Sequence, residues 1–432
     1  MMQHLLVVNM YSPLRPDGAH TPSGAHSLDP DPSSKDGPMT NVCISGVGMM
    51  PFTKPGKSET YEKMGAAATI AALQDAGIDY SDVQQAYVGY VYGDSTSGQN
   101  ALYQVGMTGI PVVNVNNNCS TGSSALWLAR QAVASGTADC VLALGFEQMQ
   151  PGALVNAYAD RPSPTARGEN IAAARPGGDA PAPSAAKMFG GAGVEYMSRY
   201  GVTNEVFGRV SVKARSHAGR NPLAVFRDPI DLDTVMNSKQ IWGPLTLLMC
   251  CPPTNGAAAA IVCSEEFARA RGLDASIRVR AQSMVTDLAG TFDTTDMMKV
   301  AGYDMTAKAA AEVYEQSGID PLDIPVVELH DCFSTNEVIT YEGLGLTPEG
   351  TAEKFVLDGD NTYGGRVVTN PSGGLLSKGH PLGATGLAQC AELVWQLRGQ
   401  AGDRQVDGAR IALQHNLGLG GACVVTLYEK VG

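Results

Sequence analysis

The sequence predicts an α/β protein made of two similar halves, on three observations. The chain has 432 residues, 44% of them hydrophobic, which is enough for two cores of ordinary size. Its 50 glycines and 25 prolines are spread along the chain, as expected for many tight turns between short elements. A segment near residue 76 also recurs near residue 317. Together these observations favour duplicated units of alternating strands and helices.

The repeat defines the expected elements of each half. Residues 76–83 (AGIDYSDV) resemble residues 317–324 (SGIDPLDI), and each segment lies between an alanine-rich helical stretch and an apolar strand-like run. Helices are predicted over 121–136 and 385–399, because each range opens with Thr-Gly, closes with glycine and precedes a buried strand. We expect βαβ-type halves whose pseudo-twofold axis brings equivalent strand-to-helix turns to one central site.

Changes in composition predict the domain boundaries. Residues 1–40 are rich in turn formers and poor in periodic apolar residues, so we predict a flexible tail. A second polar stretch, rich in Pro, Gly and Ala, begins near residue 150, and helical patterns with several basic residues follow it. We therefore predict an insertion over 150–249 between an N-terminal half (41–149 and 250–275) and a C-terminal half (276–432).

Charge and cysteine content exclude several classes of function. A formal charge of −13 and a pI near 5.0 argue against a nucleic-acid partner or an anionic membrane surface. No run of about 18 apolar residues indicates a membrane span, and no secretory signal opens the chain. Nine cysteines without paired metal-ligand spacing indicate a reducing compartment, and the adjacent Cys250 and Cys251 are interpreted as packed small side chains. We expect an intracellular soluble protein without stable membrane insertion.

Cys119 is the first candidate for chemistry. The β-rich run 112–118 ends abruptly, and an alanine-rich helix follows, so Cys119 is predicted at the N-terminus of that helix. Free N–H groups and the positive end of the helix dipole favour a thiolate there. A lone cysteine at a strand end is more often part of a core, so the assignment needs partners.

His380 is the first partner, in the matching turn of the second half. It lies between Gly379 and Pro381 just before the predicted helix, where the backbone is restricted. A histidine can take the proton of a thiol and polarise a thioester carbonyl near neutral pH. We therefore assign it a functional role rather than a structural one.

His330 and Cys332 form the second partner group. They follow an apolar strand at 325–327 and are two residues apart, so they face one side of an extended segment. A zinc site is the rival interpretation, but no further Cys or His at ligand spacing completes it, and we expect no metal. The glycine-rich run 415–421, which includes Gly418, could offer N–H groups to an oxyanion, although many such runs are only turns.

At this point the sequence from about residue 42 to 430 resembles the thiolase superfamily, specifically the sterol-carrier-protein type of 3-ketoacyl-CoA thiolase. The resemblance implies that Cys119 is the acylated nucleophile and that His380, in a Gly-His-Pro motif, is its base. Most thiolases carry a second cysteine in a C-terminal Cys-x-Gly-x-Gly motif, where this chain has Asn416. The sterol-carrier type instead carries a His-Asp-Cys-Phe motif, which is similar to residues 330–333 and implies that Cys332 is the acid/base thiol, tuned by His330.

The resemblance implies further site residues. Asn336 would hold a water at one oxyanion hole together with His380, and the N–H groups of Cys119 and Gly418 would form the other. Met188, in a Met-Phe-Gly run, resembles a substrate-pocket position. The insertion would bind coenzyme A, with its phosphates near basic residues of that region, namely Arg199, Arg209, Lys213, Arg215, Arg220 and Arg227.

The implied fold is the five-layered αβαβα thiolase fold with an inserted loop domain. The implied activity is cleavage of a 3-ketoacyl-CoA by coenzyme A, which acts as a co-substrate without any permanently bound cofactor, in a homodimer or homotetramer. The alternatives are a noncatalytic acyl-CoA or sterol-binding protein and a thiolase-like condensing enzyme or retro-aldolase. The presence of both Cys119 and Cys332 argues against a retro-aldolase, which needs no acyl-cysteine. We expect no lipid-transfer domain after residue 427. Peroxisome, mitochondrion and bacterial cytosol stay open.

Overall fold

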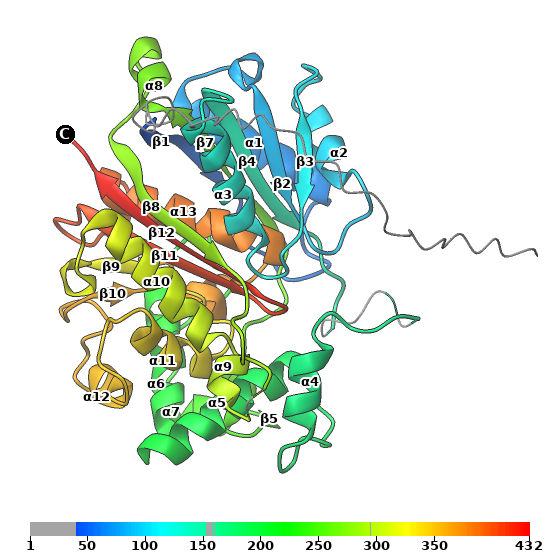
Figure 1. Cartoon of the computed structure of the whole chain (residues 1–432), viewed down its shortest axis with the longest axis vertical. Coiled ribbons are helices and arrows are strands. Elements are labelled where there is room, and N and C mark those ends of the chain that lie inside the picture. Colours follow the sequence, from blue (N-terminus) through cyan, green and yellow to red (C-terminus); the bar gives the residue numbers. More distant parts are fainter. Residues whose placement is uncertain (1–39, 153–157, 159, 294) are drawn as a thin grey trace, which may run out of the picture. The chain divides into compact units, whose positions relative to one another are not determined.

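The computed structural model describes residues 40–152, 158, 160–293 and 295–432. Residues 40–432 form one compact unit (Figure 1). The predicted tail over residues 1–40 lies, apart from Thr40, outside the described residues. Among the described residues, no helix is long and apolar enough to cross a membrane.

Ten strands form one continuous sheet, in the order β10-β9-β11-β12-β8-β1-β7-β4-β2-β3. Five strands come from each half, and the halves meet where β1 pairs with β8 through Cys43 and Arg278. The first five are β1 (Val42–Met49), β2 (Gln85–Gly89), β3 (Val112–Val115), β4 (Cys140–Glu147) and β7 (Gly256–Ser264). The second five are β8 (Ile277–Val285), β9 (Val326–Glu328), β10 (Val368–Thr369), β11 (Ile411–Gly418) and β12 (Ala422–Lys430).

The two sets of strands have the same topology. In the first half, β7 pairs antiparallel with β1 and β4, and β2 pairs parallel with β4 and β3. In the second half, β12 pairs antiparallel with β8 and β11, and β9 pairs parallel with β11 and β10. The predicted duplication is therefore confirmed, since each strand has a counterpart with the same neighbours and direction.

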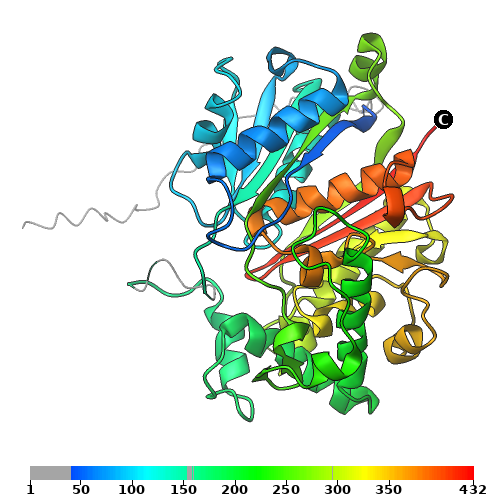
Figure 2. The same cartoon turned by 180° about the vertical axis from the view of Figure 1, so that it is seen from behind.

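Helices complete the five layers. The helices α1 (Tyr61–Ala76) and α10 (Tyr303–Ser317) cover the outer faces of the two halves, and α3 (Thr121–Ala134) and α13 (Leu382–Arg398) lie between them. Figure 2 shows α13 (orange) between the strands of the first half and the red strands β11 and β12. The outer helices end at Gly77 and Gly318, both in the left-handed conformation that favours glycine. The five-layered αβαβα arrangement predicted from the sequence is therefore confirmed.

Two helices from the region between β4 and β7 pack on the second half. The helices α5 (Ser184–Tyr200) and α6 (Glu205–Ala218) pack on α11 (Ser334–Gly343) and share its apolar core. The other elements are α2 (Ser97–Tyr103), α4 (Ala166–Ala173), α7 (Leu232–Met236), α8 (Glu265–Arg271), α9 (Met297–Val300), α12 (Ala352–Leu357), β5 (Gln240–Trp242) and β6 (Leu245–Thr246). The boundaries of the inserted domain stay a prediction.

One helix start differs from the prediction. The helix α13 begins at Leu382, three residues before the Thr-Gly pair expected to open it, because Pro381 at the N-cap has a φ of −73° that suits the start of a helix. His380 consequently lies immediately before the N-cap. This places its backbone closer to the positive end of the helix than the sequence pattern implied.

The starts of α3 and α13 pack backbone against backbone. A Cβ added to Gly386 of α13 would lie 2.2 Å from the backbone nitrogen of Ser123 of α3. A Cβ on Gly122 would lie 2.7 Å from the carbonyl oxygen of Gly383. Only glycine allows such an approach. The turns before the two helices, which carry Cys119 and His380, are thereby brought together.

Gly386→Ala tests this contact. Alanine favours a helix over glycine by about 1 kcal/mol, but its methyl group would press on the Ser123 backbone, so we expect a net destabilisation of about 2 kcal/mol. Urea unfolding measures the change. Gly106→Ala is the control, because a Cβ there would meet only the Tyr80 ring at 3.2 Å. Equal stability of the two variants would contradict a close helix contact.

Candidate active site

Three side chains from different elements converge at the centre of the protein. One ligand-type atom each from Cys119, His330 and His380 lies within 4.8 Å of the others. Cys119 precedes α3, His330 follows β9 and His380 precedes α13. The pseudo-twofold arrangement thus brings strand ends and helix starts of both halves together. Three residues proposed for catalysis from the sequence meet at one point.

Cys119 occupies a tight turn between β3 and α3. Asn118 has a φ of 51°, and its side-chain amide donates to the carbonyl oxygen of Leu419, which holds the turn against the second half. Burial, and then the carboxylate of Glu147, raise the pKa of the Cys119 thiol to about 12. Loss of solvation thus opposes the thiolate that the helix dipole favours. The nucleophile needs a base.

His380 has the protonation state of that base. Its Nδ1 lies 2.7 Å from Oγ1 of Thr385, whose own hydroxyl donates to the carbonyl oxygen of Pro381, so Nδ1 carries the proton. Nε2 is left as the acceptor, and it is buried without a hydrogen-bond partner among the described residues. Burial, with Lys378, lowers the His380 pKa to about 3. A neutral imidazole with a free Nε2 lone pair therefore lies beside the Cys119 thiol.

His330 has the opposite tautomer. The oxygen of Asn416 accepts from Ser123, so its amide nitrogen donates to Nδ1 of His330 at 3.0 Å. The proton of His330 is then on Nε2, where it is a hydrogen-bond donor. Burial and the neighbouring His380 and His415 lower the pKa of His330 well below its usual range. His330 can therefore donate a hydrogen bond to a substrate oxygen while staying neutral.

Cys332 lies next to two other thiols. It is 4% exposed, and its carbonyl oxygen accepts from the N–H of Cys251 at 2.9 Å. Burial, followed by Cys251 and Cys119, raises the pKa of Cys332 well above its usual value. Cys332 is therefore a neutral thiol that carries its proton. Cys251, interpreted from the sequence as packing, also belongs to this group.

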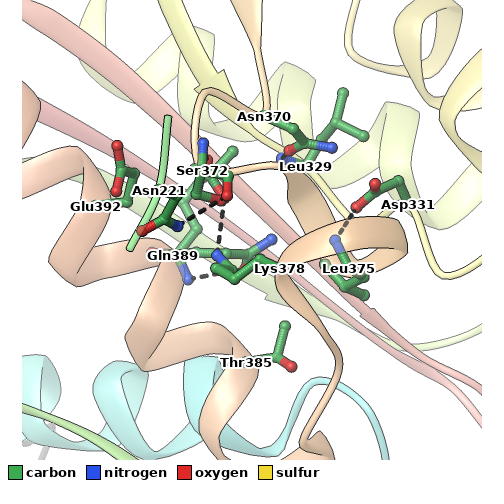
Figure 3. A network of polar contacts seen from close by, with 12 residues as sticks. Asn221, Leu329, Asp331, Asn370, Ser372, Leu375, Lys378, Thr385, Gln389 and Glu392 are labelled. Carbon is green, nitrogen blue, oxygen red and sulfur yellow. Dashed lines mark hydrogen bonds and ion pairs between the residues drawn. The ribbon is translucent and has the colours of Figure 1, made fainter. Parts of the chain in front are cut away.

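The loop that carries His380 is held by two buried carboxylates. Asp331 accepts the N–H groups of Leu375 and Leu376 at 2.7 and 3.3 Å, in the π-helical turn Gly374–Lys378. Lys378 pairs with Glu328 at 3.2 Å. Figure 3 shows Asp331 beside Leu375 and shows Lys378 within this polar network. Burial and Glu337 raise the pKa of Asp331 to about 8. These contacts fix the segment that leads to His380.

The residues predicted to bind substrate lie in two places. Gly418 and Met188 both line a cavity of about 300 Å³, together with Phe292, Met305 and Leu417. Asn336 lies in the first turn of α11, and its side-chain amide donates to the backbone carbonyl oxygen of His330. A water-holding role for Asn336 beside His380 stays a prediction, because in this structure its amide nitrogen is directed to that carbonyl.

The predicted coenzyme A contacts divide into exposed and buried groups. Lys213 has a 7% exposed side chain and pairs with Glu337, so its ammonium faces the interior and is not available to a phosphate. Arg209 is exposed and pairs with Glu205 one turn away. Arg220 lies over the ring of Tyr363 at 4.0 Å. Arg215 contacts the loop that carries His380, through Oγ of Ser377 at 3.3 Å. Of the other two, Arg199 pairs with Glu195 and Asp296, and Arg227 donates to the carbonyl oxygen of Gly219.

Two family models match this chain. The model of the thiolase N-terminal domain matches residues 42–266, and the model of a thiolase C-terminal domain-like region matches residues 289–428. The chain belongs to the thiolase family. The expected resemblance to the sterol-carrier type is also confirmed, because this thiolase-family chain is 54% identical to sterol carrier protein 2 of Rattus norvegicus over 90% of this chain and 72% of that protein.

Other relatives of this thiolase-family chain carry different names. It is 39% identical to the benzoylsuccinyl-CoA thiolase subunit BbsB of Thauera aromatica over 88% of this chain and 95% of that protein. The solved structure of the Ltp2-ChsH2(DUF35) aldolase matches with a TM-score of 0.76 and 27% identity, over 91% of this chain and 98% of that chain. The proteins similar to this chain are therefore named as carriers, thiolases and an aldolase.

Sequence reasoning missed several residues of the site. Asn416 was noted only as a departure from the cysteine motif, yet it sets the tautomer of His330. Thr385 was interpreted as a helix start but accepts from His380, and Thr254 accepts the backbone N–H of His380 at 2.6 Å. No local pattern identifies Thr254, because it is distant in the chain. For Asn416 and Thr385, the only signal in the sequence is that each is a polar residue near a recognised motif.

The raised pKa of Cys119 predicts its reactivity toward iodoacetamide. Because the thiol stays protonated below a pKa of about 12, the rate of alkylation should increase about tenfold per pH unit between about pH 7 and pH 9. Mass spectrometry of the Cys119 peptide measures the rate, and Cys119→Ala corrects for the partly exposed Cys250 and Cys251. A plateau below about pH 8 would mean that the helix dipole dominates after all.

Proposed function

We propose that this protein is a 3-ketoacyl-CoA thiolase, an acetyl-CoA C-acyltransferase that works through an acyl-Cys119 intermediate. The observation that carries the proposal is the meeting of Cys119, His330 and His380 within 4.8 Å. Gly418, which lies against the Cys119 turn, also lines the cavity that Met188 lines. A neutral thiol, a free imidazole base and an N–H donor are the groups that thiolysis requires. Coenzyme A is a co-substrate in this proposal, and lipid or sterol side-chain metabolism is its context.

The first step forms the acyl-enzyme. His380 takes the Cys119 proton on Nε2 as the sulfur adds to the 3-keto carbon. The bond between C2 and C3 then breaks, and its electron pair moves to C2 as the enolate of acetyl-CoA. Nε2–H of His330 donates to the enolate oxygen, where one good donor in a dry site contributes about 3 kcal/mol.

The second part releases both products. Cys332 gives its proton to C2, which completes acetyl-CoA, and the proton that His380 took from Cys119 passes to the Cys332 thiolate. His380, neutral again, takes the proton of the coenzyme A thiol as its sulfur attacks the acyl-Cys119 thioester. The Cys119 sulfur leaves and receives that proton from His380. Because the same groups serve both directions, a Claisen condensation is the reverse reaction.

The oxyanion of each tetrahedral intermediate needs its own donors. Gly418 lies against the Cys119 turn, since a Cβ on it would be 2.2 Å from the carbonyl oxygen of Asn117 and 2.8 Å from Oγ of Ser120. Only glycine lets β11 approach this turn so closely. We propose that the N–H groups of Cys119 and Gly418 bind the oxygen of the intermediate.

Coenzyme A would be held where the insertion contacts the His380 loop. Val225 and Phe226 donate backbone hydrogen bonds to Lys378 and Ser377 of that loop. Lys54 and Arg215 each lie within 5 Å of the Phe226 ring, at 4.8 and 4.9 Å. Two cations beside one aromatic ring suit the phosphates and the adenine of coenzyme A. A homodimer or homotetramer stays part of the proposal.

A retro-aldolase is the second candidate, because the Ltp2-ChsH2(DUF35) aldolase is 27% identical to this chain. Retro-aldol cleavage of a 3-hydroxyacyl-CoA needs a base but no acyl-cysteine. Cleavage of such a substrate by Cys119→Ala would favour this candidate. A noncatalytic acyl-CoA or sterol carrier would bind acyl-CoA but cleave neither substrate.

Thiolysis by matched variants tests the main proposal. With acetoacetyl-CoA or a longer 3-ketoacyl-CoA, Cys119→Ala should lower kcat about 10⁴-fold or more, and Cys332→Ala should lower it about 100- to 1,000-fold. Loss of enolate absorbance follows the reaction. Cys390→Ala, a buried cysteine of α13 outside the site, is the control and should keep its activity. Thiolysis that survives in Cys119→Ala would exclude the acyl-enzyme route.

Arg215→Ala tests the coenzyme A contact. Loss of a guanidinium that binds phosphate should increase the KM for coenzyme A about tenfold and leave kcat nearly unchanged. Arg209→Ala is the control, because Arg209 is paired with Glu205 and does not contact the His380 loop. An equal effect of both substitutions would indicate a general charge effect instead of a specific contact.

A further inference from the structure

Glu147 is a fully buried carboxylate that the proposed reaction does not use. It ends β4 and is 0% exposed. Its Oε2 accepts the N–H of Val91 at 3.1 Å and of Gly383 at 3.0 Å, and its Oε1 accepts the N–H of Tyr92 at 2.9 Å. Val91 and Tyr92 follow β2 of the first half, whereas Gly383 lies in the first turn of α13 of the second half. One carboxylate therefore joins the two halves.

The duplication identifies what this contact corresponds to. Residue-for-residue alignment of the two repeats places Gln85 of β2 on Val326 of β9. These residues pair with Val141 of β4 and Ala412 of β11, respectively. The ends of β4 and β11 are then equivalent, so Glu147 is the counterpart of Gly418.

The helix starts correspond in the same way. Alignment of the Thr-Gly pairs of α3 and α13 places Cys119 on Gly383. The N–H of Cys119 from the first half and the N–H of Gly418 from the second half form the proposed oxyanion hole. In the second half, the equivalent N–H of Gly383 already binds the Glu147 carboxylate. One anion-binding turn is open to substrate, and its counterpart is filled by the protein itself.

We propose that Glu147 is a positioning residue: its carboxylate occupies the counterpart of the oxyanion hole and thereby holds the His380 turn in register with the Cys119 turn. This inference rests on the proposed thiolase function. Its physical basis is that a carboxylate is bound strongly by N–H groups at a helix start. Gly383 is three residues from His380, so a displacement of this first turn moves the base directly.

The electrostatic surroundings of Glu147 make the residue pH-sensitive. Among the described residues, Tyr92 from the β2 end and Cys119 from the α3 turn are the titratable groups that face it. Burial raises the Glu147 pKa to about 7, although three backbone hydrogen bonds lower it. Its contribution to stability is therefore complete below the unfolded pKa near 4.5 and is lost as pH increases through 7. The ionised carboxylate, which is the form that positions His380, therefore lowers the stability of the fold. Such a cost is expected of a functional residue.

Kinetics of Glu147→Gln test the inference. The amide has only one acceptor oxygen, so the His380 turn shifts, and kcat should fall about 100-fold with little change in KM. The wild-type kcat should decrease as pH falls through about 7, and this acid limb should be absent in Glu147→Gln. Glu342→Gln is the matched control, since Glu342 is also buried and accepts the N–H of Ala352 at the start of α12, away from the site.

Two kinetic results overturn the inference. One is a kcat of Glu147→Gln within about twofold of wild type, and the other is an equal loss of kcat in Glu342→Gln. If Glu147→Gln does not fold, Glu147→Asp replaces it. That variant keeps the charge on a shorter side chain, so it should keep the acid limb at a reduced kcat, and full activity would count against positioning.

Hydrogen exchange separates this inference from the proposed reaction. Peptides covering 88–93 and 379–386 should exchange faster in Glu147→Gln than in wild type and Glu342→Gln, because Glu147 binds an N–H group in each. If wild type shows no thiolysis but these peptides do change, the thiolase proposal fails and the positioning role stands. Unchanged exchange in both peptides overturns the positioning role, whatever the activity.

Discussion

The contact between the starts of α3 and α13 is the constraint on which the site depends. Gly122, Gly383 and Gly386 let the two helices approach backbone to backbone, at distances that any Cβ would prevent. Because each helix is preceded by a turn with a reactive side chain, this approach also fixes the separation of Cys119 and His380. The outer helices and sheets support the contact but could tolerate small shifts that the active site could not.

Burial sets the chemistry of the site more than any single charged neighbour does. Loss of solvation raises the pKa of Cys119 and lowers that of His380, so the resting pair is a neutral thiol and a neutral imidazole. Thr385, which accepts from Nδ1 of His380, and Asn416, which donates to Nδ1 of His330, then give the two histidines opposite tautomers. One ring can take a proton, and the other can donate a hydrogen bond. A dry site also strengthens each of these interactions when charge develops during reaction.

Duplication followed by divergence explains the asymmetry between the halves. The strands of the two halves correspond one to one, yet Cys119 corresponds to Gly383 and Glu147 corresponds to Gly418. The N–H of Gly383, the counterpart of Cys119, donates to the Glu147 carboxylate, which joins the start of α13 to the first half. The hydrogen bond from Leu375 to Asp331 and the ion pair between Lys378 and Glu328 also restrain the loop before His380.

The sequence by itself determined the duplicated α/β fold, the helix-start position of Cys119 and the candidate residues His330, Cys332 and His380. These follow from local patterns: periodicity, turn residues and short motifs. Only the tertiary structure decided the protonation states, the place of Lys213 in the interior and the roles of Asn416, Thr254 and Glu147. Solvation and hydrogen-bond partners depend on residues far apart in the chain, so no local pattern contains them.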